Sequence, residues 1–169
     1  NLAGNNRLAV ATTSPTANAT GAGQNVFLRN TGATTNITGP SAAGATFDLL
    51  SNGGISTAAG STLTATDLSV TATTGGLSFA AGITAPSSIT LSAQNSITSG
   101  NFTAPLTSNT VNLTSTAGSI GDLAGNNRLI VNTSNLVANA GGAGQNVFLQ
   151  NTGAATTLAA SSGAAATFN

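Results

Sequence analysis

The chain has 169 residues and no net charge, and only three basic and three acidic side chains occur in it. A charged fraction of 4%, against about 25% in ordinary soluble domains, argues against nucleic acid or anionic lipid as a partner, because such binding needs clustered lysine and arginine. The absence of cysteine excludes a disulfide framework and a thiolate metal site, and no apolar run is long enough to insert into a membrane.

Short alternating segments recur along the chain. In residues 26–30, 47–51, 68–72, 89–93 and 111–115, apolar side chains alternate with small or polar ones, and the segments begin 21 or 22 residues apart. Such alternation is typical of a half-buried strand, and the intervening clusters of glycine, asparagine, serine and threonine are typical of turns. The pattern returns at Val147, and the RLIV stretch around Leu129 predicts an intermediate strand. Each coil of about 20 residues therefore carries one such strand.

Helix and disorder fit the chain less well. Glycine occurs 21 times, β-branched residues are frequent, and no stripe of period 3.6 persists for ten residues, all of which disfavour helix. Disordered chains usually combine high charge with few aliphatic side chains, whereas this chain has a mean hydropathy of +0.22.

A longer repeat contains the shorter one. Residues 2–48 align without a gap on residues 123–169, an offset of 121, and 30 of the 47 aligned positions are identical. We expect six coils to make one long repeat. The sequence thus predicts a single continuous segment over residues 1–169, cut from a longer repetitive protein.

The predicted fold is all-β, a parallel β-solenoid, because one strand at a fixed place in each short repeat can bury its inner side only against the next coil. The predicted inward side chains are Val26 and Leu28, Phe47 and Leu49, Leu68 and Val70, Ile89 and Leu91, and Val111 and Leu113. Asparagines at the turns either stack in ladders or serve simply as turn residues. These asparagines are Asn30, Asn52, Asn95 and Asn151.

Residues 87–100 (SSITLSAQNSITSG) and 109–153 resemble the repeats of filamentous-haemagglutinin-like bacterial exoproteins, which are large secreted adhesins. The similarity covers essentially the whole chain. It implies a right-handed solenoid, an extracellular or cell-surface location, and a structural role in adhesion or biofilm. The Asn-Pro-rich secretion signature of that family has no match in these residues. The sequence therefore identifies neither the export route nor the receptor.

An enzyme is not expected. The chain lacks histidine, cysteine, lysine and glutamate, so acid–base chemistry would depend on a pair of aspartates, of which Asp48 and Asp67 are the candidates on adjacent coils. Both are expected to lie on a solvated face. No run of acidic residues suits calcium, and we expect no cofactor and no metal.

Two aromatic side chains break the alternation. If Val26 and Leu28 point inward, Phe27 points outward, and so does Phe148 in the second copy. We expect the two rings either to mark a lateral contact, with self-association along or beside the solenoid, or to be covered by a turn of their own chain. Arg29 is expected to pair with Asp48 on the next coil.

An outward polar array offers an alternative function, a ligand-binding face of the kind that binds ice or another surface. Small hydroxyl and amide side chains occupy the outward positions of three successive strands, although solvent-facing strands favour threonine in any case. The array consists of Ser69, Thr71, Thr90, Ser92, Asn112 and Thr114.

Overall fold

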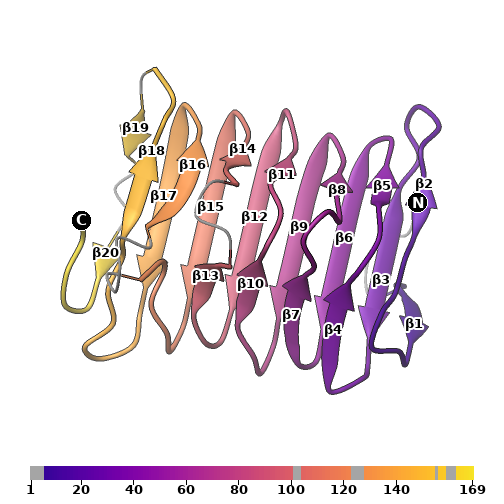
Figure 1. Ribbon diagram of the computed structural model, residues 1–169, viewed down its shortest axis with the longest axis horizontal. Coiled ribbons are helices and arrows are strands. Elements are labelled where there is room, and N and C mark those ends of the chain that lie inside the picture. The colour runs from indigo at the N-terminus through magenta and orange to yellow at the C-terminus, as the bar shows by residue number, and fades with distance from the viewer. Residues whose placement is uncertain (1–5, 101–103, 123–127, 155, 159–162) are drawn as a thin grey trace.

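The computed structural model describes residues 6–100, 104–122, 128–154, 156–158 and 163–169, and none of these residues lies in a helix. The strands pair in parallel and stack as a β-solenoid of about seven turns, with about 21 residues in each turn. The two ends of the chain lie at opposite ends of the stack (Figure 1). The predicted fold is therefore confirmed.

Three sheets run along the stack. The broad sheet has the order β1 (Leu8–Val10), β3 (Val26–Asn30), β6 (Thr46–Ser51), β9 (Asp67–Ala72), β12 (Ser88–Ala93), β15 (Thr110–Ser115), β17 (Asn135–Ala140) and β19 (Thr157–Leu158), with β20 (Gly163–Ala164) also paired to β17. The four-stranded sheet contains β4 (Thr34–Ile37), β7 (Gly54–Thr57), β10 (Leu77–Phe79) and β13 (Ile97–Ser99). The seven-stranded sheet contains β2 (Asn18–Ala19), β5 (Ser41–Ala43), β8 (Leu63–Thr64), β11 (Ile83–Thr84), β14 (Leu106–Thr107), β16 (Leu129–Asn132) and β18 (Leu149–Asn151). A typical coil contributes one strand to each of the three sheets in turn.

The register of the broad sheet places like side chains above one another. Leu91 pairs with Val70 on one side and with Leu113 on the other, and all three are fully buried. Ser92 pairs with Thr71 and Thr114 in the same ladder and faces outward. The predicted inward and outward positions of these strands are confirmed, because a shift of one residue would exchange the two faces.

A buried polar network turns the chain from the broad sheet into the four-stranded sheet. The Asn30 amide donates to the Thr12 carbonyl and to the Thr35 hydroxyl, each at 2.7 Å, and accepts from Gly32 N–H at 3.1 Å. The Thr35 hydroxyl in turn lies 2.8 Å from that of Ser51. Because Ser51 rather than an asparagine is the ladder neighbour of Asn30, this asparagine acts as a turn residue and forms no asparagine ladder.

The other turn asparagines follow the same pattern or bond through the main chain. Asn151 accepts from the N–H groups of Thr133 and Gly153, the counterparts 121 residues later of the groups around Asn30. Asn52 and Asn95 each donate a main-chain N–H to the preceding coil. The side chains of Asn30 and Asn151 therefore satisfy local main-chain groups at these turns.

The expected count of six coils in one long repeat is wrong. Val111 pairs with Leu136 of β17, a strand that the sequence did not predict, and not with the predicted intermediate strand around Leu129. Val147, where the pattern returns, pairs with Ile120. The RLIV stretch does form a strand, β16, but it lies in the seven-stranded sheet. Successive starts of the broad-sheet ladder at Thr46, Asp67, Ser88, Thr110 and Asn135 lie 21, 21, 22 and 25 residues apart. A repeat of 121 residues is thus between five and six coils.

As a consequence, the two copies keep their internal pairing but lie in different sheets. Leu8 pairs with Leu28 in the broad sheet, and their counterparts Leu129 and Leu149 pair in the seven-stranded sheet. The pairing of β2 with β5 likewise recurs, between β17 and β20. The counterpart of Leu136 in the first copy is Pro15, which lies before β2. Proline has no N–H to donate to a ladder, so the two-residue β2 is shorter than β17.

Substitution at paired inward and outward positions tests the register. We expect Leu91→Asp to lower the free energy of unfolding by several kcal/mol, because it buries an unpaired carboxylate, and Ser92→Asp to change it by about 0.5 kcal/mol or less. Both variants carry the same new charge, so thermal melting compares burial alone. Equal losses in the two variants would contradict the register.

Candidate functional site

The outer side of the broad sheet assembles the predicted polar array. Two rows run across β9, β12 and β15, since Thr90 pairs with Ser69 and Asn112, and Ser92 pairs with Thr71 and Thr114. We call Ser69, Thr90 and Asn112 the first outer row, and Thr71, Ser92 and Thr114 the second outer row. Thr90 and Thr114 are exposed, whereas the other four side chains are half-buried by their neighbours.

Apolar or charged side chains end the first outer row on both sides and the second outer row on one side. The first outer row continues into Asp48 on β6 and into Val137 on β17, and the second continues into Leu50 and Asn139. Both rows are therefore polar across three strands, and the second outer row extends onto a fourth through Asn139. The chemistry of the array is neutral, with hydroxyl and amide groups that both donate and accept hydrogen bonds.

A shallow groove of about 300 Å³ borders the second outer row, and its polar lining consists of Thr71, Thr73, Ser92, Gln94 and Thr116. The Thr73 hydroxyl donates to the Asn52 carbonyl at 3.0 Å, and the Thr116 hydroxyl donates to the Gln94 carbonyl at 3.3 Å. These two hydroxyls stabilise the turns of adjacent coils and retain lone pairs that can accept from a ligand. The groove can thus make hydrogen bonds but no ionic contact.

One ion pair crosses the outer side of the broad sheet near its first strand. Arg7 directly precedes β1 and lies one coil before Phe27, and Asp48 lies one coil after it. The Arg7 guanidinium donates to Asp48 Oδ2 from Nε at 3.1 Å and from Nη2 at 2.6 Å. Phe27 is half-buried between these partners. The expected pairing of Asp48 with Arg29 is wrong, because Arg7 reaches the carboxylate from two coils away.

The second copy repeats this arrangement in another place. Arg128 Nη2 donates to Asn169 Oδ1 at 2.8 Å, with Asn169 in the position that corresponds to Asp48. Phe148 is buried, with 6% of its surface exposed, and follows Val147, which pairs with Ile120. Burial of Phe148, which is not part of the hydrophobic core cluster, fits the alternative in which its own chain covers the ring. Lateral contact stays a prediction for Phe27.

The aspartates that were candidates for catalysis have other partners. Asp48 binds Arg7, and Asp67 accepts a hydrogen bond from the Ser88 hydroxyl at 2.6 Å. In the described part of the chain, no three potential metal-binding side chains cluster, and no helix is long and apolar enough to cross a membrane. The absence of enzymatic activity stays a prediction.

The chain matches no protein-family model, no curated protein and no solved structure. Its function therefore has to be argued from its own repeat and surface.

Removal of the Arg7 guanidinium tests the ion pair. Both side chains are partly shielded, with 25% of Arg7 and 14% of Asp48 exposed, so we expect Arg7→Ala to reduce stability by about 1 kcal/mol. The reduction should shrink in about 1 M salt, where charges are screened beyond about 3 Å. Arg29→Ala is the matched control, because Arg29 is exposed, and urea unfolding of both variants is the measurement. An equal loss in the control would contradict this assignment.

Proposed function

We propose that this chain is a segment of a structural shaft in a large secreted or surface-anchored bacterial protein of adhesin type. The observation that carries the proposal is the unbroken column of buried side chains that runs from coil to coil, of which Val70, Leu91 and Leu113 are the centre. Such a column can be lengthened by further coils without any change in cross-section. A shaft needs this property.

The chemistry of the surface supports the same function. A rod of this kind carries few charges and small neutral side chains on its broad sheet, and the candidate carboxylates are held by neighbouring side chains. Function then depends on length and rigidity rather than on a reactive centre. The resemblance to filamentous-haemagglutinin-like repeats supports an extracellular location, and the lack of cysteine is compatible with export in an unfolded state.

Extension of the chain by one repeat tests the shaft. Asn169 corresponds to Asp48, so residues 49–169 can be appended after Asn169 in the natural repeat order. We expect the longest dimension from small-angle X-ray scattering to increase by about 27 Å with an unchanged cross-section, because adjacent strands lie about 4.8 Å apart. Growth in cross-section instead of length would contradict the proposal.

Location on the cell surface is tested separately. Antibodies raised against the 169-residue chain should label intact cells of the source bacterium, and protease added outside the cells should remove the label. Labelling that appears only after permeabilisation would contradict a surface shaft, whatever the length of the rod.

A second candidate function is a ligand-binding face, which the alignment of the two outer rows favours. Hydroxyl groups in register on a flat sheet present a regular pattern to a surface such as ice. Thermal hysteresis of the purified chain, and its loss in Thr90→Lys, would support this function. No hysteresis at any protein concentration would exclude ice and leave the shaft.

A further inference from the structure

The turn between β6 and β7 contains an asparagine with a distinctive neighbour. Asn52 is the only asparagine of the sequence that is followed directly by glycine. The side-chain amide of an asparagine can be attacked by the main-chain nitrogen of the next residue, and a glycine there has no Cβ to hinder ring closure. The sequence thus places the most favourable pair for this reaction in the middle of the stack.

The packing of the coils fixes the glycine in this pair. A Cβ atom on Gly53 would overlap the carbonyl oxygen of Ala33 on the preceding coil, so no other residue fits at this position. Among the described residues, the Gly53 N–H has no hydrogen-bond acceptor. Removal of its proton therefore breaks no bond of the turn.

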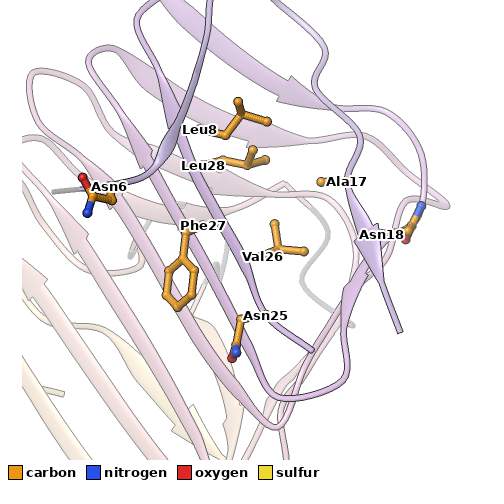
Figure 2. Close-up of a pocket in the computed structure, with 8 residues that line it drawn as sticks. All are labelled: Asn6, Leu8, Ala17, Asn18, Asn25, Val26, Phe27 and Leu28. Carbon is orange, nitrogen blue, oxygen red and sulfur yellow. The ribbon is translucent and has the colours of Figure 1, made fainter. Parts of the chain in front are cut away.

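The side chain of Asn52 is also free to react. It is half-buried and makes no hydrogen bond within the described part of the chain. Asn25, at the edge of the pocket shown in Figure 2, provides a contrast, because its amide donates to the Gly23 carbonyl at 3.2 Å and accepts from Thr46 N–H at 3.0 Å. The branched side chain of Val26 follows it. Both the amide and the next residue thus protect Asn25.

The main chain of Asn52 joins three successive coils. Its N–H donates to the Asn30 carbonyl of the preceding coil at 3.0 Å. Its carbonyl accepts from the hydroxyls of Thr73 and Thr74 on the next coil, at 3.0 and 2.5 Å. A change in the length of the main chain at Asn52 would therefore disturb contacts on both sides.

We propose that Asn52 is a site of spontaneous deamidation in the folded protein. Hydroxide removes the proton of the Gly53 nitrogen, which forms a bond to Cγ of Asn52. The bond from Cγ to Nδ2 breaks, and the amide nitrogen takes up a proton from water and leaves as ammonia. Water then opens the resulting five-membered imide at one of its two carbonyl carbons, so the reaction consumes water and needs no oxidant or reductant.

The two products of ring opening differ in their effect on the stack. Opening at the side-chain carbonyl gives aspartate with an unchanged main chain, and the half-buried position allows its carboxylate to contact water. Opening at the main-chain carbonyl gives isoaspartate, which inserts Cβ of residue 52 into the main chain. The carbonyl that Thr73 and Thr74 bind becomes a side-chain carboxylate in that product. The inference depends on this turn and stands whether or not the chain serves as a shaft.

Peptide mapping of the aged protein tests the site. The folded chain is kept in mildly alkaline buffer below its melting temperature, digested, and analysed by mass spectrometry, with isoaspartate measured by enzymatic methylation. We expect conversion at Asn52 to be several-fold faster than at Asn25 or Asn30, whose amides are held by hydrogen bonds. The matched control Asn52→Gln retains an amide but requires a larger ring, and should show no conversion at this position. Equal rates at the three asparagines, or conversion of Asn52 only in urea, would overturn the proposal.

Thermal melting separates the two products. Asn52→Asp reproduces the aspartate product and should melt close to the unmodified chain. The aged protein, which contains isoaspartate as well, should melt at a lower temperature than Asn52→Asp, and the Asn52→Gln protein aged in the same way should not change. Equal melting of the aged protein and Asn52→Asp would overturn the effect of isoaspartate on the stack.

Discussion

The contact between one coil and the next is the interaction on which the rest of this structure depends. A coil of about 21 residues has too few apolar side chains to form a core of its own, so each inward leucine, isoleucine or valine is buried by its equivalents above and below. The parallel strand pairs also satisfy the main-chain N–H and C=O groups by hydrogen bonds from coil to coil along the stack. With a charged fraction of 4%, the molecule has few ion pairs to add to this contact.

Because the contact between coils is local, the same residue pairs form in both copies of the repeat, even where the two copies lie in different sheets. The pairing of Leu8 with Leu28 recurs between Leu129 and Leu149, although the two pairs lie in different sheets. The side-chain hydrogen bonds between Arg7 and Asp48 have their counterpart in the hydrogen bond between Arg128 and Asn169. Duplication of a unit that is not a whole number of coils therefore preserves internal bonds and moves equivalent side chains to another side of the rod.

Much of the fold could be predicted from the sequence because it depends on period-two alternation. Val70, Leu91 and Leu113 stand at regular spacing between turn residues, and both their burial and the grouping of the outward rows were predicted correctly. β17 was missed because its segment NLVANA has alanines at two of its three inward positions, so it shows little contrast between faces. Cover over Phe148 was left open, because alternation does not show what packs over an outward side chain.

The side on which a repeated motif lies depends on the length of every turn before it. The coil that starts at Thr110 has 25 residues instead of 21. The alternation of apolar and polar residues within a strand does not show how long the turns between strands are. The partner of Asp48 was also missed. The prediction paired it with Arg29 on the adjacent coil, whereas its partner Arg7 lies two coils away. Both errors concern geometry that accumulates along the stack rather than local propensity.

Engineered cysteine pairs test the stacking register most directly, because the chain has no cysteine of its own. The structure places Asn112 beside Val137, whereas the predicted intermediate strand around Leu129 would place it beside Ile130, which lies instead in the seven-stranded sheet. Neighbouring parallel strands bring Cα atoms within the 4.4 to 6.8 Å range, roughly, that a disulfide spans. Asn112→Cys with Val137→Cys should therefore form an intramolecular disulfide under mild oxidation, and Asn112→Cys with Ile130→Cys should not. Cross-linking of the second pair in preference to the first would contradict the account.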